Sequence, residues 1–360
     1  MACWVDRLVA GGFVAPLTLA SALRRSRLSW RRWPQALVLG LSGVAVQPLA
    51  WLQSLLYGRA LRQLELPSDP VIVIGHWRSG TTYLHQLLSA DPQAATARNV
   101  LIIAPQVALL LKPLLVPLLG RWMSAKRPID AVPWGPMDPQ EDEIGLARLS
   151  FDTHMAGVAF PQEYPFHFRR CVLSSTPGFR RQFLHFCRLT LLHEGSGKCH
   201  WLIKNSAHTA RVPLLLELFP KARFVLLQRD SVDSIRSLVQ VKQNLADLVG
   251  MQPAPDAVRQ VEETASAHRL LMDAFEAARA QIPAGQLVEV PYDALIEAPL
   301  ATVQRIYREL SLVGWQQAKP QVAARVEQSK HYCARPVQLE SKAEQRLQVL
   351  MKSAAIRSAA

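Results

Sequence analysis

Residues 71–82 read VIVIGHWRSGTT, a short run of apolar residues followed at once by a glycine-containing turn and two threonines. The apolar run predicts a buried strand, Val71–Ile74, and the turn predicts a helix from Thr82. Successive backbone N–H groups in such a turn point to one place at the helix start, where the helix dipole adds partial positive charge. The segment therefore predicts an α/β fold with an anion-binding loop at a strand end.

The spacing of the glycines in this loop bears on the kind of anion. Gly75 and Gly80 stand as in a Walker A loop, which binds nucleoside triphosphates with a lysine after its second glycine. This chain has Thr81 in that place, and its cation comes earlier, as Arg78. The side chain that would hold the outer phosphates of a triphosphate is therefore missing. For the loop alone, a turn that binds no ligand is the alternative.

A second strand-to-helix junction, FVLLQRDSVDSIRS, spans residues 224–237. Arg229 follows the strand, and Ser237 lies two turns into the next helix with its side chain directed back toward the helix start. The two side chains can therefore converge on one phosphate. An arginine that caps the helix through Asp230 or Asp233 is the alternative.

Further strand patterns, each followed by a helix pattern, predict the overall fold. They cover residues 201–203, 223–227 and 286–290, with helices from Ala207, Val232 and Pro299. Such alternation predicts a mainly parallel central sheet between helices, a P-loop-like three-layer α/β fold. Ligands of these sheets bind beyond the carboxyl ends of the strands, where both loops lie.

The charge balance indicates an anionic partner. The chain has 41 Lys and Arg against 28 Asp and Glu, a formal net charge of +13. Nucleic acid, an acidic membrane and a phosphorylated nucleotide all fit this charge. No stretch interleaves cations with aromatic residues for base stacking, so we expect no nucleic-acid partner. The scattered His and Cys residues predict no metal site, and five unpaired cysteines fit a cytoplasmic protein.

The N-terminal region predicts contact with a membrane. Residues 33–58 carry no charge, and five arginines precede them, at positions 24, 25, 27, 31 and 32. Pro34, Pro48 and several polar residues disfavour a straight spanning helix, so we predict an interfacial or re-entrant segment at the inner face of a membrane. A buried helical hairpin is the alternative.

A second apolar stretch and the C-terminal region complete the division of the chain. Val100–Met123 contains Pro105, Pro113 and Pro117, which predict broken helices that cap an apolar acceptor site or pack in the core. Residues 340–357 predict an exposed helix. We therefore expect a helical, membrane-contacting extension (1–66), a catalytic domain (67–335) and a helical tail (336–360).

The two loops together resemble the cofactor motifs of the cytosolic-type and bacterial sulfotransferase superfamily, over residues 70–312. The resemblance implies transfer of a sulfuryl group from 3′-phosphoadenosine-5′-phosphosulfate (PAPS) to a hydroxyl or amine, without a metal. The 5′-phosphosulfate loop would comprise Arg78, Ser79, Gly80, Thr81 and Thr82, and the 3′-phosphate clamp Arg229 and Ser237. Tyr83 stands where many relatives carry a tryptophan that stacks on adenine. Lys204, in WLIKNSAHTAR, matches the family lysine beside the sulfuryl group.

The general base departs from the pattern of the family. The best-known members carry a histidine two residues after the lysine, where this chain has Ser206. His208 is one candidate base, and the acids of the segment PQEDE (139–143) are others. We favour Glu141 narrowly over Glu143 and His208. An acidic helix start that pairs with Arg127 or Arg148 is an equal alternative for these carboxylates.

Two other functions remain open at the level of sequence. A P-loop-type small-molecule kinase would explain the first loop but requires magnesium and a Walker lysine. A noncatalytic, membrane-associated nucleotide-binding protein would keep the clamp and tolerate loss of Lys204. For the acceptor, the apolar segments favour a lipid, sterol or membrane glycan. The basic segment Ser329–Tyr332 could supply a lid over the 3′-phosphate.

Overall fold

The computed structural model describes residues 4–123, 134–329 and 337–358. Its sheet has the strand order β2-β3-β1-β4-β5, and every paired strand is parallel. The strands are β1 (Val71–Ile74), β2 (Ala94–Ala95), β3 (His200–Lys204), β4 (Arg223–Gln228) and β5 (Leu287–Pro291). The predicted α/β fold with a mainly parallel central sheet is confirmed. The short edge strand β2 was not predicted.

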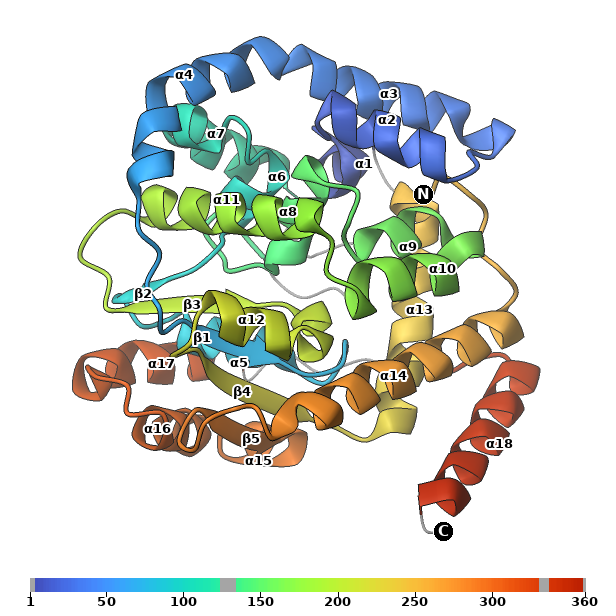
Figure 1. Cartoon of the computed structure of the whole chain (residues 1–360). Coiled ribbons are helices and arrows are strands. Elements are labelled where there is room, and N and C mark those ends of the chain that lie inside the picture. Colours follow the sequence, from blue (N-terminus) through green and yellow to red (C-terminus); the bar gives the residue numbers. More distant parts are fainter. Residues whose placement is uncertain (1–3, 124–133, 330–336, 359–360) are drawn as a thin grey trace.

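Helices cover both faces of the sheet (Figure 1). Before and between the first strands lie α1 (Trp4–Gly11), α2 (Pro16–Arg25), α3 (Trp33–Ala45), α4 (Gln47–Gln63), α5 (Thr81–Leu88), α6 (Asn99–Ile103), α7 (Ala108–Trp122), α8 (Asp142–Leu149), α9 (Met155–Ala159), α10 (Tyr164–Phe168) and α11 (Pro177–Glu194). After β3 come α12 (Val212–Leu218), α13 (Ser231–Val249), α14 (Ala257–Arg279), α15 (Tyr292–Glu297), α16 (Pro299–Glu309), α17 (Trp315–Ser329) and α18 (Ser341–Ser358). Short helical turns include the 3-10 helix η4, Ser206–Ala210.

Alternate residues of β1 point to the two helical layers, as the pleat of a strand requires. Val71 and Val73 pack with residues of α5 and α16 on one face. Ile72 and Ile74 pack on the other face, with residues of α8, α11, α12 and α14. All four β1 side chains are buried, which explains why the strand reads as a continuous apolar run.

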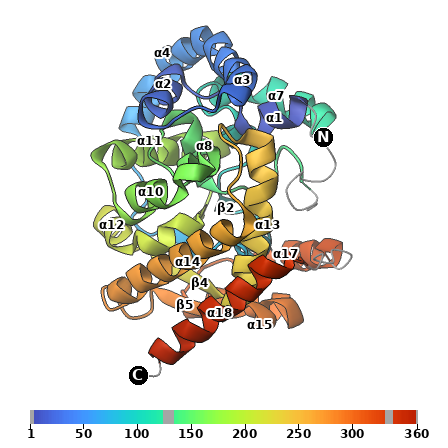
Figure 2. The ribbon, with the colours of Figure 1, turned by 90° about the vertical axis from the view of Figure 1, so that its right-hand side faces the viewer.

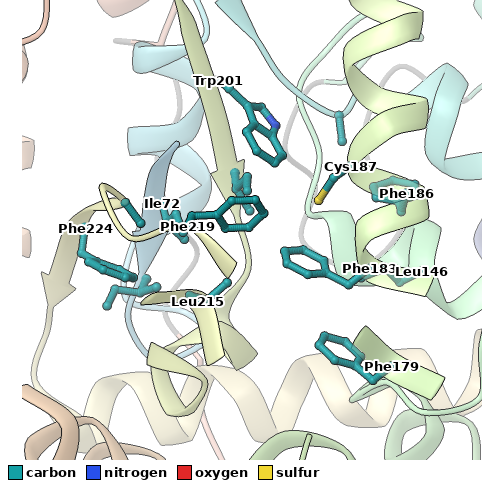
Figure 3. Close-up of a cluster of buried hydrophobic side chains, with 14 of the residues drawn as sticks. Ile72, Leu146, Phe179, Phe183, Phe186, Cys187, Trp201, Leu215, Phe219 and Phe224 are labelled. Carbon is teal, nitrogen blue, oxygen red and sulfur yellow. The ribbon is translucent and has the colours of Figure 1, made fainter. Parts of the chain in front are cut away.

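Aromatic side chains hold α8 against α11 and the sheet. Figure 3 shows Phe183 of α11 directed toward Phe219, and the same buried cluster includes Phe186 of α11, Trp201 of β3 and Leu146 of α8. A Cβ atom at Gly145 would lie 2.5 Å from the ring of Phe186, so α8 approaches α11 too closely for any side chain there. This packing places the first turn of α8 beside the end of β3.

The helices α1–α4 lie at one end of the molecule and α18 at the other (Figure 1, Figure 2). Many large apolar side chains of α2–α4 face outward, among them Leu17, Trp51 and Leu55, which are 85%, 67% and 78% exposed. Among the described residues, Trp30–Gln63 is long and apolar enough to cross a membrane, by length and composition alone. Only 28% of its most apolar window is buried, so these helices are not a typical core hairpin.

Two expectations about helices need correction. The helix α7 continues through Pro113 and Pro117, and the chain breaks only near Pro105. Both prolines inside α7 are exposed and four residues apart, so the carbonyl groups left without partners share one solvent-facing side. The tail helix α18 was expected to be exposed, yet Ala343 and Leu347 are fully buried in a cluster with α13 and α14.

Other boundaries agree closely or stay untested. The helix expected from Ala207 is η4 followed by α12, whereas helices expected from Val232 and Pro299 begin at Ser231 and Pro299. The division at residues 66 and 335 stays a prediction. Of the proposed lid, residues 330–332 lie outside the described residues, as does Arg127.

Candidate active site

Three residues of the glycine loop after β1 have positive φ angles, which few residues other than glycine adopt. Gly75, Arg78 and Gly80 have φ of +133°, +70° and +93°. A Cβ at Gly75 would lie 2.4 Å from the carbonyl oxygen of Leu227 in β4, so a glycine is needed there for steric reasons as well. The Gly75 amide donates to the hydroxyl of Thr209 in η4, at 2.8 Å. This bond ties the loop to the segment that follows β3.

The second motif meets the first directly. Arg78 Nε donates to Ser237 Oγ at 3.0 Å, and Arg229 Nη1 donates to the carbonyl oxygen of Arg78 at 3.0 Å. The Arg229 guanidinium also lies 4.4 Å from the ring centre of Tyr292, at the start of α15. The same ring lies against Gly80, where a Cβ would be 2.7 Å from it. Tyr292 therefore supports both motifs.

The capping alternative for Arg229 has partial support. Arg229 Nη2 lies 3.9 Å from Asp233 Oδ2, a long contact with a half-exposed carboxylate. Asp230 caps α13 itself, because its side chain accepts a hydrogen bond from the Asp233 amide. Arg229 is therefore not required as the cap of this helix.

The remaining predicted donor residues line the start of α5. Thr81 is buried, whereas Thr82 and Tyr83 are half-buried. The Ser79 hydroxyl donates to the carbonyl oxygen of His76 at 2.7 Å, so it stabilises the turn. Burial raises the pKa of Tyr83, although the nearby Arg325 of α17 opposes this effect. The ring therefore stays a neutral phenol at physiological pH.

Lys204 and Glu141 form an ion pair at the carboxyl edge of the sheet. Lys204 pairs in register with Val73, so its side chain leaves β3 next to the glycine loop. Its Nζ donates to Glu141 Oε2 at 2.5 Å, and the amide of Ser206 donates to Glu141 Oε1 at 3.0 Å. The Lys204 and Glu141 side chains are only 5% and 12% exposed. The pair brings together two residues that are 63 positions apart.

Glu143 has a different environment from Glu141. Arg211 donates to both of its carboxylate oxygens, at 3.0 and 3.1 Å, and Asn205 and the His154 amide donate as well. Burial favours the neutral acid, but the charge and hydrogen bonds of Arg211, followed by those of the other donors, lower the pKa of Glu143 to about 2. Glu143 is therefore a buried, ionised partner of Arg211, which ties α8 to η4.

His208 is enclosed within the protein. Its side chain is fully buried, with Nε2 at 3.4 Å from Asp142 Oδ2 and its ring edge-on to Phe183. Arg211 Nη1 lies 3.2 Å from Nδ1 of His208. Burial raises the pKa of Asp142, although His208 opposes this effect. The histidine thus contacts other buried groups and not the glycine loop.

Two aromatic rings beside the loop were not predicted as site residues. Trp77, in the loop, stacks on His154 with ring centres 4.1 Å apart. Burial lowers the pKa of His154 to about 4, although Glu143 and Glu141 oppose this effect, so the ring is neutral at physiological pH. His154 lies in the segment after α8, 77 residues beyond Trp77, and no sequence signal links the two.

Among residues 4–123, 134–329 and 337–358, no three His, Cys, Asp or Glu side chains gather in a group that could hold a metal ion. Cys171 and Cys187 are buried as free thiols, and Cys199 is exposed as a free thiol.

Known proteins resemble this chain in sequence and in fold. It is 25% identical over 287 residues to omega-hydroxy-beta-dihydromenaquinone-9 sulfotransferase Stf3 of Mycobacterium tuberculosis and of Mycobacterium bovis, covering 78% of this chain and 72% of each relative. The crystal structure of sulfotransferase STF9 from Mycobacterium avium has a TM-score of 0.65 at 18% identity and covers 95% of both chains. That of STF1 from Mycobacterium tuberculosis has a TM-score of 0.65 at 19% identity, covering 96% of this chain and 93% of that one.

The two structural neighbours share the three-layer architecture of this chain. At 18% and 19% sequence identity, they support the fold alone. The family model is decisive for classification. The model of the sulfotransferase family matches residues 70–317, which include both motifs, Lys204 and the segment of Glu141. Because this match covers well over half of the chain, the protein belongs to the sulfotransferase family.

Proposed function

We propose that this sulfotransferase uses PAPS as its donor and transfers the sulfuryl group to a hydroxyl of a lipid-like acceptor. The observation that carries the proposal is the meeting of Arg78, Arg229 and Ser237 at the edge of the sheet where Lys204 and Glu141 pair. An adenosine bisphosphate has two anionic groups at opposite ends of one ribose. Two adjoining cationic loops therefore suit it better than they suit a single phosphate.

The loop residues fit the donor's phosphosulfate. The first amides of α5 have no carbonyl within the helix to bind, so those of Thr81 and Thr82 are available to an anion. Arg78 adds a positive charge in the same loop. Arg229 and Ser237 would hold the 3′-phosphate, and Tyr83 would stack on the adenine ring. No lysine follows Gly80, which disfavours the triphosphate ligand of a kinase.

PAPS would supply an activated sulfuryl group, whose bond to the 5′-phosphate oxygen breaks as a new bond to the acceptor oxygen forms. The chain would supply charge and a proton acceptor. Lys204 would stabilise the negative charge that develops on the departing oxygen. The acceptor's hydroxyl proton would pass to a carboxylate oxygen of Glu141. Before this transfer, Lys204 would exchange its contact with Glu141 for the donor, leaving that carboxylate free to accept the proton.

Glu141 is a better candidate base than the two alternatives. Glu143 has its carboxylate oxygens occupied by Arg211 and other donors, and its pKa of about 2 makes it a poor proton acceptor. His208 is fully buried against Asp142, Arg211 and Phe183. Glu141 alone of the three contacts Lys204 and retains some exposure.

The acceptor class rests on two observations. The relative Stf3 is named for a hydroxylated menaquinone derivative, a lipid. In this chain, outward-facing apolar residues of α2–α4 lie next to exposed arginines, including Arg24, Arg27 and Arg31. An apolar face with a basic flank favours binding in the plane of an anionic membrane. We therefore propose a cytoplasmic enzyme that meets a lipid acceptor at the inner membrane face.

Incubation with PAPS labelled in its sulfuryl group tests the function. A membrane lipid extract serves as the acceptor mixture, and EDTA is present in half of the reactions. We expect labelled products heavier by one sulfuryl group by mass spectrometry, formed equally with and without EDTA. Turnover of ATP alone would favour the kinase. Tight binding of 3′,5′-adenosine bisphosphate without transfer to any acceptor would favour the noncatalytic alternative.

A further inference from the structure

A largely apolar cavity lies between the N-terminal helices and the helices above the sheet. Its volume is about 90 Å³, several times the roughly 10–15 Å³ that one water molecule requires. The wall includes Gly11, Ala22 and Leu39 of α1–α3, Ile144 and Ala147 of α8, and Ala156 of α9. Figure 1 shows α8 and α9 between the sheet and the N-terminal helices, so this cavity lies on the same side of the sheet as Glu141.

The helix α8 connects the cavity with the candidate base. Glu141 is the N-cap of α8, and Ile144 and Arg148, three and seven residues further on, lie on one face of the helix that begins there. Both line the cavity. At a rise of ~1.5 Å per residue, this face extends roughly 10 Å from Glu141. A chain lying along it would have one end beside Glu141 and the rest inside the cavity.

A second connection runs through the segment between α8 and α9. Thr153 and Met155 line the cavity, and His154 between them stacks on Trp77 of the glycine loop. The cavity wall and the donor loop are therefore joined by a single residue. Two separate elements thus bring the cavity and the proposed reaction centre together.

The lining of the cavity selects the chemistry of its occupant. Arg148 is the only charged residue in the described wall, and its Nη2 is used by the carbonyl oxygens of Val9 and Ala10 at the end of α1. Apart from the hydroxyl groups of Thr18, Ser150 and Thr153, the other wall residues are aliphatic, aromatic, glycine or methionine, so the wall is mainly apolar. An aliphatic chain gains free energy for each methylene group it buries.

We propose that this cavity binds the aliphatic chain of the acceptor alcohol and directs its terminal hydroxyl along α8 to Glu141. The inference rests on the proposed sulfotransferase reaction and adds the site at which the acceptor binds. The chain enters from the side of α1–α3, where the outward-facing residues of α2 and α3 form part of the apolar surface described above. An acceptor can thus pass from a membrane into the protein without crossing water.

Binding of tritiated 1-dodecanol, measured by equilibrium dialysis without donor, tests this site. The variant Ala22→Phe fills the cavity from α2. Ala50→Phe is the matched control, because Ala50 is equally buried at 7% exposure but lies in α4, outside the cavity wall. We expect dodecanol to bind wild type and Ala50→Phe, and to bind Ala22→Phe about tenfold more weakly. Equal binding by both variants, or none by wild type, overturns the proposal.

Binding of 3′,5′-adenosine bisphosphate, measured in the same samples, reports whether each variant is folded. If Ala22→Phe loses it, the smaller change Ala147→Leu on α8 replaces that variant, with the same expected selective loss of dodecanol. The failures of the two proposals are distinguishable. Dodecanol binding that Ala22→Phe abolishes, without sulfuryl transfer from PAPS in wild type, would retain the cavity site and reject the reaction. Sulfuryl transfer to dodecanol at the same rate in wild type and in Ala22→Phe would retain the reaction and reject the cavity site.

Discussion

The two sides of the candidate site are built in different ways. On the donor side, residues 75–80 form one continuous loop that leads into α5, and the second motif reaches it through contacts of Arg78 with Arg229 and Ser237. On the acceptor side, Glu141 meets Lys204 across the chain, and the cavity combines segments from the N-terminus to Met251. Each donor-side motif is thus a continuous stretch of sequence, although the two motifs meet only in the fold, whereas the acceptor side has no continuous motif.

This contrast implies that a substitution on one side of the site should leave the function of the other side unchanged. Glu141→Gln tests this with the largest expected effect. The amide keeps the shape of the side chain but cannot accept the acceptor's proton. We expect kcat to fall roughly 10²–10⁴-fold. Binding of 3′,5′-adenosine bisphosphate should stay within about twofold of wild type, since donor residues are untouched. Near-normal kcat would place the base elsewhere, and a His208→Asn variant that is folded but inactive would identify it.

The ion pair of Glu143 and Arg211 should affect stability on both sides, because it joins α8 to η4. Breaking a buried pair costs about 3–5 kcal/mol, so we expect Glu143→Gln to lower the free energy of unfolding by that amount at neutral pH. The folded pKa of about 2 lies below the ordinary 4.5. The carboxylate therefore stabilises the fold fully above pH 4.5, and this stabilisation disappears as the pH falls through 2.

Urea unfolding at several pH values measures this effect. The difference between 4.5 and about 2 corresponds to about 3 kcal/mol that depends on pH. The gap between wild type and Glu143→Gln should therefore shrink as the pH falls from 4.5 toward 2. Glu217→Gln, an exposed partner of Arg180, is the control and should change stability by less than about 1 kcal/mol. A gap that does not depend on pH would show that Glu143 is not ionised in the fold.

The same contrast decides how much could be predicted from the sequence. The strand Val71–Ile74 was predicted to the residue and the start of the following helix to within one residue, because a buried parallel strand and a glycine turn depend on neighbouring residues. The preference for Glu141 over Glu143 was narrow, because only the fold reveals which carboxylate meets Lys204 and which meets Arg211. Trp77 and the cavity carry no local signal, so sequence reasoning missed them.

The donor side can be tested by Arg229→Ala, for which we expect a smaller effect. A hydrogen bond to a charged group contributes about 1.5–3 kcal/mol, so binding of 3′,5′-adenosine bisphosphate should weaken roughly 10–100-fold. Binding of adenosine 5′-monophosphate, which lacks the 3′-phosphate, should change little. Arg236→Ala, on the helix α13 that follows Arg229, is the control, because Arg236 pairs with Glu344 and Asp233 at the surface. Equal losses for the two nucleotides would contradict the clamp.

We expect the smallest effect at the N-terminal surface, which is formed by the outward-facing residues of α2–α4. Arg31 is exposed at the basic flank of α3, and one arginine near an anionic membrane contributes about 1 kcal/mol. Arg31→Gln should therefore weaken binding to phosphatidylglycerol vesicles about fivefold in a sedimentation assay, without changing binding to phosphatidylcholine vesicles or to 3′,5′-adenosine bisphosphate. Arg308 of α16 is also exposed but lies away from the N-terminal helices, so Arg308→Gln is the matched control. If both substitutions weaken vesicle binding equally, the attraction comes from the net charge of the protein and not from a membrane-facing surface, and the acceptor must reach the cavity by another route.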